Sequence, residues 1–343
     1  MRALKDYNDS INQKMQEMRE RIIQARELSW RNFGRKIQFY VPSFSYYKNQ
    51  CFRSSPVLFP SISVTGSFCA LNCKHCEGKI LKTMIPAQTP NELIQVCHDI
   101  KKKGGIGCLI SGGCLPDGSV PIYRFIDALA EIKDKLGLKI VTHTGLIDLL
   151  TVQRLKEAGV DAVLIDIIGS DDTIKEIYHL NASTRDYEES LEALSKSKIP
   201  FVPHVLVGLH YGNIIGELNA LKMIAKFSPS ALILIAFFPL KDTLMENVKP
   251  PSPESIIEVL VQARFMMPKV PLVLGCARPK GKHRDKTDSL AVETGVNAIA
   301  FPSKEAIKQA EFMGLEATFS PLCCSQIYED ITKFEKSRSF TNG

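Results

Sequence analysis

The sequence lacks the long apolar segment that a membrane-spanning protein needs. Although 45% of the 343 residues are hydrophobic, none of the uninterrupted apolar runs approaches the roughly 20 residues that cross a bilayer. Residues 1–6, MRALKD, also lack the apolar core of a secretion signal. We therefore expect neither membrane association nor export, and we expect a cytoplasmic protein.

The sequence also lacks a strong charge of one sign. Its 43 Lys and Arg residues stand against 37 Asp and Glu residues, which gives a net charge of +6. There is no zinc-finger spacing and no recognisable nucleic-acid-binding module, so nucleic acid is not expected as a partner. The densest basic stretch, Arg278 to Lys286, is interpreted as a solvated loop, with a phosphate, carboxylate or acidic protein site as the alternative.

Sequence repeats are absent, and the only low-complexity tract is a proline-rich turn at residues 250–253. From residue 61 onward, short apolar segments alternate with amphipathic helical patterns, which implies a parallel sheet with right-handed crossovers. We therefore predict an α/β fold, a closed (β/α)8 barrel of the TIM type, with an open doubly wound sheet as the alternative. The predicted strands are 61–65, 107–111, 139–142, 162–167, 201–207, 231–236, 272–275 and 298–301.

An N-terminal helical extension is predicted to precede this barrel. Apolar residues recur at helical spacing within residues 1–36, and they form one stripe that we expect to pack on the main domain. We predict three parts: residues 1–60 as the helix and lead-in, 61–302 as the barrel, and 303–343 as the last helix and a C-terminal segment. The stripe consists of Ile11, Met15, Met18, Ile22 and Ala25.

Three cysteines follow the first predicted strand closely. Cys69, Cys73 and Cys76 lie within eight residues, on a loop at the end of a barrel where catalytic groups collect. Three thiolates can hold an iron–sulfur cluster while one iron keeps an open position. A structural zinc site would need a fourth ligand, and the ring of His75 is adjacent to Cys76 and poorly placed to supply it. We therefore favour a cluster over zinc and over three unrelated core cysteines.

This Cys-x3-Cys-x2-Cys loop resembles the signature of the radical S-adenosylmethionine (SAM) superfamily. The resemblance implies a 4Fe-4S cluster on the three cysteines, with SAM bound at the open iron. Electron transfer into the sulfonium then yields a 5′-deoxyadenosyl radical that abstracts hydrogen from an unactivated carbon. His75 departs from the pattern, because the superfamily usually has an aromatic ring there, but a flat imidazole can still line the adenine.

Other strand ends match positions that contact SAM in the superfamily. Ser111-Gly112-Gly113 resembles the Gly-Gly-Glu motif that meets the amino group of SAM, with Cys114 in place of the Glu; glycine keeps a Cβ out of the way. A tight strand exit is the structural alternative. The resemblance implies further cofactor contacts for Asp166 and for His143, with a capping or core role as the alternative. Val207-Gly208 resembles the segment on which adenine rests.

The resemblance narrows to archaeal-type biotin synthase homologues. It is carried by the residues around Gly66, Cys114, Gly208 and Cys276 and by the late pair Cys323-Cys324. One branch of these proteins is the second component of a two-protein lipoyl synthase. Membership would imply sulfur insertion into an octanoyl chain on a lysine of a lipoyl-carrier protein, with a companion radical SAM component. An electron donor such as ferredoxin or flavodoxin would be required.

The remaining cysteines support sulfur insertion, because such enzymes consume a second iron–sulfur cluster as sulfur donor. Cys114 and Cys276 end two predicted strands, and with Cys323 and Cys324 they could converge over the barrel mouth, although adjacent cysteines rarely both bind one iron. Arg278 is a candidate ligand or carboxylate contact there, with a surface role as the alternative. Packing better explains three other cysteines. These are Cys51, Cys97 and Cys108.

Two other functions stay open on sequence grounds. A radical SAM enzyme with one cluster could perform methylation, rearrangement or biotin synthase-like chemistry, in which case the extra cysteines would be dispensable. A non-catalytic iron–sulfur or zinc protein would not cleave SAM.

Overall fold

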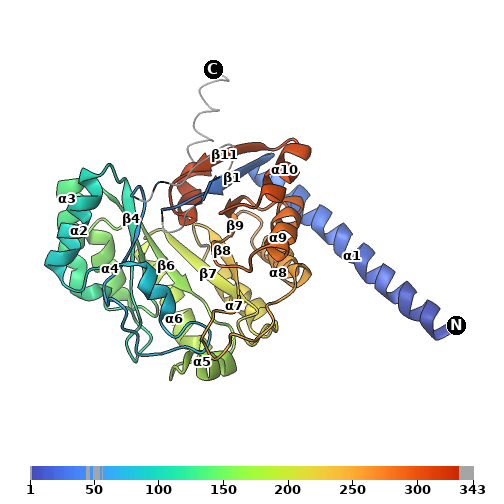
Figure 1. Ribbon diagram of the computed structural model, residues 1–343, viewed down its shortest axis with the longest axis horizontal. Helices are drawn as coiled ribbons and strands as arrows, with labels where there is room; N and C mark the ends of the chain where they lie inside the picture. The colour runs from blue at the N-terminus through green and yellow to red at the C-terminus, as the bar shows by residue number, and fades with distance from the viewer. Residues whose placement is uncertain (1, 44–46, 49–54, 56, 332–343) are drawn as a thin grey trace, which may run out of the picture.

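The strands form a single parallel sheet. The structure, a computed structural model, describes residues 2–43, 47–48, 55 and 57–331. Within these residues, eleven strands lie in the order β11-β1-β10-β9-β8-β7-β6-β5-β4-β2-β3 and every pair is parallel (Figure 1). The strands are β1 (Lys36–Tyr40), β2 (Ser61–Ser63), β3 (Ile85–Pro86), β4 (Gly107–Ser111), β5 (Lys139–His143), β6 (Ala162–Asp166), β7 (Phe201–Val207), β8 (Leu232–Ala236), β9 (Leu272–Leu274), β10 (Ala298–Ala300) and β11 (Glu316–Ser320).

The structure confirms the predicted parallel α/β fold. It does not confirm the prediction that eight strands close into a barrel. The eight predicted strands correspond to β2 and β4–β10, and they are neighbours in chain order. In the described residues, however, β3 and β11 each pair on one side only, so the sheet is a half-barrel of the TIM type. Strand β11 was not predicted, because its residues Glu316 to Ser320 are largely polar or half-exposed and it pairs with β1 alone.

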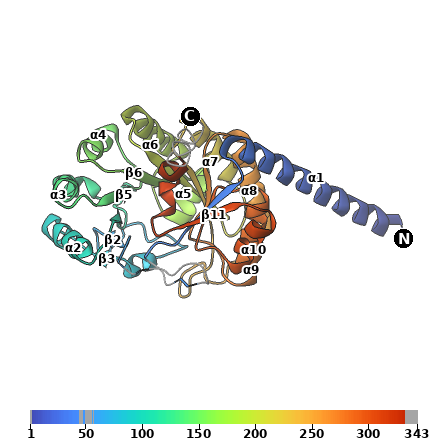
Figure 2. The ribbon, with the colours of Figure 1, turned by 90° about the horizontal axis from the view of Figure 1, so that it is seen from above.

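Helices cover the outer face of the sheet (Figure 2). Several begin at a side-chain cap that accepts a backbone N–H bond of the first turn, namely at Thr89, Asp148, Ser170, Ser252 and Ser303. The helices are α1 (Arg2–Phe33), α2 (Pro90–Lys102), α3 (Ile126–Leu136), α4 (Leu149–Glu157), α5 (Asp171–Tyr178), α6 (Thr184–Ser197), α7 (Glu217–Ala225), α8 (Pro253–Met266), α9 (Lys282–Glu293) and α10 (Lys304–Phe312), with short 3-10 turns η1 (Lys79–Thr83), η2 (Ile122–Phe125) and η3 (Cys324–Gln326).

The first helix leaves the body of the molecule. Its N-terminal half projects away in both views (Figures 1 and 2), and its C-terminal half contacts α8 and α9. Arg21 forms a 2.5 Å ion pair with Glu258, and the Ser29 hydroxyl donates to Gly295 O at 2.6 Å. Of the predicted apolar stripe, Ile22 and Ala25 are buried, Met18 is half-buried, Met15 is exposed, and the side chain of Ile11 lies outside the described residues.

The strands bury both faces, as apolar runs in a parallel sheet should. In β6, Val163 and Ile165 pack toward the helices, while Leu164 belongs to a second core on the inner face of the sheet.

No described helix combines the length and the apolar character that crossing a membrane requires.

The chain after β11 fills the interior of the curved sheet. Cys323, Cys324 and Ile327 join the inner core, and the Tyr328 hydroxyl donates to Asp161 O at 3.0 Å. Farther along, Glu329 forms a 2.6 Å ion pair with Lys139, at the start of β5. This inserted segment brings cysteines from the end of the chain to the middle of the fold.

Candidate active site

A cavity of about 350 Å³ opens at the carboxyl ends of the central strands. It is lined by most of the predicted site residues, whereas Val207, Gly208, Cys323 and Cys324 are not part of its lining. The predicted residues that line it are Cys69, Cys73, His75, Cys76, Ser111, Gly112, Gly113, Cys114, His143, Asp166 and Cys276.

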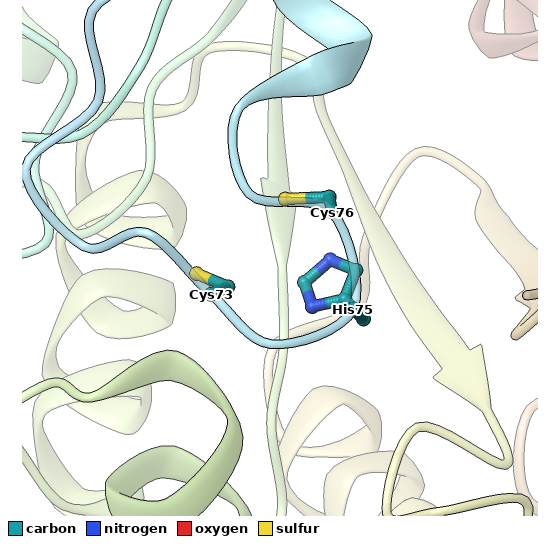
Figure 3. A group of neighbouring side chains, drawn as sticks. All are labelled: Cys73, His75 and Cys76. Atoms are coloured by element: carbon teal, nitrogen blue, oxygen red, sulfur yellow. The ribbon is translucent and has the colours of Figure 1, made fainter. Parts of the chain in front are cut away.

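The cysteine loop wraps one wall of this cavity. Cys73 and Cys76 lie on the two arms of a tight turn with His75 between them (Figure 3), and the Cys76 N–H donates to Cys73 O at 3.0 Å. The loop is fixed from outside, because Lys74 N donates to Ile177 O at 2.9 Å and Ala70 N donates to Cys114 O at 2.8 Å.

The thiols of the loop are electrostatically suited to binding metal. A hydrogen bond from Cys114 lowers the pKa of Cys69 to about 6, against the opposing effect of burial. A hydrogen bond from Cys73, with a further one from His75, lowers the pKa of Cys76 to about 4, and the pKa of Cys73 is raised correspondingly. Thiolates are the form that binds iron, and the lowered pKa values favour that form at Cys69 and Cys76. All three cysteines line the same cavity.

His75 lies closer to the thiols than expected. Its ring nitrogen and the sulfurs of Cys73 and Cys76 all lie within 4.8 Å of one another, so adjacency to Cys76 does not remove the imidazole from this group. The ring also lies 5.4 Å from that of Tyr178. These three side chains together form a group that could hold a single metal ion such as zinc.

The Gly112-Gly113 turn packs against the cysteine loop itself. Gly113 N donates to the Thr65 hydroxyl at 2.7 Å, and a Cβ built on Gly113 would lie 2.0 Å from Phe68 O and 2.6 Å from the Cα of Cys69. A Cβ on Gly112 would meet only the Thr65 and Val64 side chains, at 3.1 Å or more. The packing of the cysteine loop therefore requires glycine at position 113, independently of any contact between this residue and SAM.

A Gly113→Ala variant should therefore lose most of its loop-bound iron after anaerobic reconstitution. The added methyl group has no room against backbone atoms, and relieving the clash displaces Cys69 at a cost of about 1–3 kcal/mol. Gly112→Ala is the matched control and should retain its iron, since a side chain can move by a few tenths of an ångström. Iron analysis and the cluster absorbance measure the difference between the two variants. Equal iron in both would contradict the steric role assigned to Gly113.

Two histidines flank the carboxylate at the end of β6. His143 Nε2 lies 3.4 Å from Asp166 Oδ1, and the rings of His143 and His204 are edge to face with centroids 5.6 Å apart. Burial opposes ionisation of Asp166, but the charges of His143, His204 and His75 together outweigh it and lower the pKa of Asp166 to about 2. Burial lowers the pKa of His204 to about 4. Asp166 is thus an ionised acceptor facing the cavity.

The segment expected to support adenine lies outside the cavity. Val207 is buried, Gly208 has φ +76°, and Gly208 N donates to Glu217 Oε1 at 2.7 Å. A Cβ on Gly208 would meet the Pro251 ring at 2.5 Å. The positive φ and the close Pro251 ring explain why the turn that ends β7 has glycine at position 208.

The four other candidate cysteines separate into two places. Cys114 belongs with the loop, because its backbone carbonyl accepts from Ala70 N at 2.8 Å. Cys276 lines the cavity and packs against the inner core that contains the buried residues Cys323 and Cys324. Cys97 and Cys108 are buried outside the cavity, as expected for packing, and Cys51 lies outside the described residues.

Arg278 is neither a site ligand nor a surface residue. It is 1% exposed and forms a bidentate pair with Asp288, with N–O distances of 2.7 and 2.9 Å. It also donates to Gly275 O, Ala300 O and Phe301 O, so its guanidinium ties β9 and β10 to α9.

Replacing Arg278 with Ala should lower the free energy of unfolding by about 3–5 kcal/mol, since the buried Asp288 would lose its charge partner and keep only the hydrogen bond from Ser303 N. Chemical denaturation measures this. Lys135→Ala is the control, because its pair with Glu131 is exposed and should contribute little. An Arg278→Ala chain as stable as the parent would refute the structural role.

Some lining residues were missed from the sequence. Tyr178, Leu180 and Tyr187 line the cavity from α5, the loop after it and α6. Helix α5 is only eight residues long and was not predicted from the sequence. Single apolar or aromatic residues such as these belong to no sequence motif that would indicate a site.

The structure is a parallel α/β half-barrel with three cysteines on the loop after β2. Residues 63–216 match the model of the radical SAM superfamily, so the chain carries a radical SAM domain. The chain is similar to biotin synthases: it is 22% identical over 241 residues to that of Leptospira interrogans serovar copenhageni, covering 67% of this chain and 66% of that protein. With the biotin synthase of Acidovorax sp. strain JS42 it is 25% identical, covering 71% and 70%.

Solved structures share the fold. Methylornithine synthase superposes with a TM-score of 0.57 at 18% identity, covering 92% of this chain and 91% of that one. The FeFe-hydrogenase maturase HydG from Carboxydothermus hydrogenoformans gives 0.60 at 15% identity, covering 93% and 80%. The superfamily implies a 4Fe-4S cluster and SAM as cofactors. The match to the first biotin synthase covers about two thirds of that protein's length.

Proposed function

We propose that this protein is a radical SAM sulfur-insertion enzyme of the lipoyl synthase type, acting on a protein-bound octanoyl chain. The observation that carries the proposal is that two separate thiol groups adjoin one cavity. The loop cysteines line this cavity, and so does Cys276, which packs against the inner core that contains Cys323 and Cys324. Radical formation needs the first group only; sulfur donation would account for the second.

The chain's own residues suggest how the cofactors would be held. Cys69, Cys73 and Cys76 would bind the 4Fe-4S cluster, and when SAM is bound there the pair supplies a one-electron cleavage that generates a hydrogen-abstracting radical. Asp166, ionised and facing the cavity, is suited to a ribose hydroxyl or an ammonium group. Ser111 and the Gly112-Gly113 backbone line the same wall, and we assign them to the methionyl end.

The remaining wall of the cavity suits an aliphatic chain. Leu109, Val120, Leu146 and Leu180 line it, and Ile80, which is 50% exposed, lies among its lining residues. An octanoyl chain entering from the surface would bury its methylenes against these side chains, at about 0.8 kcal/mol for each CH₂. A free, compact polar substrate would not use this lining.

The proposal requires three partners. These are the octanoylated lipoyl-carrier protein or domain, a companion radical SAM component that inserts the other sulfur, and an electron donor such as ferredoxin or flavodoxin. Free thiols and a reducible cluster require a reducing compartment, and so we propose the cytoplasm as its location.

Biotin synthase-like chemistry is the second candidate, and the relationship to biotin synthases favours it. It also inserts sulfur, but into a free small molecule. The test is therefore a comparison of substrates: the reconstituted enzyme is incubated with SAM, a reductant and either an octanoyl-lysine peptide or dethiobiotin. We expect a thiolated peptide and unchanged dethiobiotin; thiolated dethiobiotin alone would overturn the lipoyl assignment.

A further inference from the structure

Three side chains that can ligate a metal ion meet on three neighbouring strands. They are His143 at the end of β5, Asp166 at the end of β6 and His204 in β7. One ligand atom from each side chain lies within 4.8 Å of those from the other two. The group has no residue in common with either set of cysteines.

The pairing of the strands places the three side chains on one face of the sheet. In the register of the sheet, Asp166 lies opposite His204, and His143 lies opposite Leu164, two residues before Asp166. Side chains two residues apart in a strand point to the same face. Because Leu164 belongs to the inner core, all three groups face the interior of the curved sheet.

The spacing of the ligand atoms suits a single ion. His143 Nε2 lies 3.4 Å from Asp166 Oδ1, and ligand atoms bound at about 2.0–2.2 Å to one tetrahedral ion stand roughly 3.4 Å apart. The rings of His143 and His204 meet edge to face, with centroids 5.6 Å apart, so neither ring stacks over the other. Two imidazoles and one carboxylate with open positions are the donor set of mononuclear iron(II) sites, and imidazole also suits zinc.

His204 is held as metal-ligating histidines are. Its Nδ1 lies 3.2 Å from Val202 O. A carbonyl oxygen only accepts, so Nδ1 carries the proton of this hydrogen bond and Nε2 keeps a lone pair for a metal. The nitrogen of a ligating imidazole that does not bind the metal commonly donates in this way, which fixes the tautomer and the orientation of the ring.

The group opens toward the cavity of the candidate active site. His143 and Asp166 line that cavity, with 24% and 31% of their side chains exposed, whereas His204 is not part of the lining. An ion held by all three would keep open positions on the cavity side, where water or an oxygen atom of a bound molecule can coordinate and be polarised. The second oxygen of Asp166 stays available for the contact with SAM that we assign to it.

We propose that His143, Asp166 and His204 form a binding site for one divalent transition-metal ion, separate from both thiol groups. This site goes beyond the proposed function and does not depend on it, because an ion held here needs neither a cluster nor SAM.

Manganese(II) is the probe, because carboxylate and water suit it better than thiolate does, and because it is visible by EPR while oxidised 4Fe-4S clusters are silent. The full-length protein, reconstituted, oxidised and freed of loosely held metal, is titrated with manganese(II) in the absence of SAM. We expect one ion per chain and, on protein labelled with ¹⁵N-histidine, coupling to two histidine nitrogens.

A His204→Ala variant should bind manganese(II) at least about tenfold more weakly, since losing even an outer partner of a metal ligand costs that much. The manganese that it still binds should couple to one histidine nitrogen. The matched control is His98→Ala, which removes an exposed histidine on α2 and should change neither the affinity nor the coupling.

A parent chain that binds no manganese(II), or binds it without histidine coupling, would overturn the proposal, leave His143 and Asp166 as an ion pair, and leave the sulfur-insertion proposal standing. Binding that His75→Ala abolishes and His204→Ala retains would place the ion at the cysteine loop and refute the site. If His204→Ala does not fold, the parent chain decides, because two coupled nitrogens support the site and fewer refute it.

Discussion

A Cys73→Ala variant should form no 5′-deoxyadenosine above the uncatalysed background. Its sulfur lines the cavity beside Cys76, and three thiolates are needed to leave one iron open for SAM. The measurement is chromatography of the nucleoside products after incubation with SAM and a strong reductant. Iron bound to the loop should be lost in the same variant.

The control for Cys73→Ala is Cys97→Ala, which removes a buried cysteine on α2, outside the cavity. It should keep both iron and cleavage. Formation of 5′-deoxyadenosine by Cys73→Ala at the parent rate would refute the assignment of the loop. Zinc in place of iron and sulfide in the parent protein, with no cleavage of SAM, would instead support a structural metal site at Cys73, His75 and Cys76.

A Cys276→Ser, Cys324→Ala double variant should separate two activities. Cleavage of SAM depends on the loop at residues 69–76 and should persist, while thiolated product should vanish because the second thiol group is dismantled. About half of the iron should be lost as well, from about eight irons per chain to about four. Iron and sulfide analysis, nucleoside chromatography and mass spectrometry of an octanoyl-lysine peptide read out the three effects.

The same control, Cys97→Ala, shows whether loss of a buried thiol matters in itself. A double variant that still thiolates the peptide would reduce Cys276 and Cys324 to packing residues. Simultaneous loss of cleavage would mean that the two thiol groups are not independent.

The local parts of this site were predictable from the sequence. The loop cysteines are close in sequence, so their spacing alone predicts a shared metal site, and the strands that position them are short apolar runs between amphipathic helices. Strands β4 and β7 were predicted to the residue, at 107–111 and 201–207.

The parts that depend on long-range contacts were not predictable. Arg278 was expected in a solvated loop or as a candidate ligand at the cavity, because its partner Asp288 is the seventh residue of α9 and neither residue indicates their pairing in the sequence. The insertion of residues 321–331 into the sheet interior depends on contacts with Asp161 and Lys139, far away in the chain. Only the folded structure shows that Cys114 belongs with Cys69 and Cys323 with Cys276.

The origin of the inserted sulfur tests the account most directly. The protein is reconstituted with iron and isotopically heavy sulfide, freed of excess sulfide, and allowed one turnover on an octanoyl-lysine peptide with SAM and reductant. The account predicts that the peptide gains heavy sulfur, up to one atom for each chain that carries the second cluster, and that the Cys276→Ser, Cys324→Ala variant transfers none. A peptide that gains no sulfur, or gains only light sulfur from solution, would contradict it.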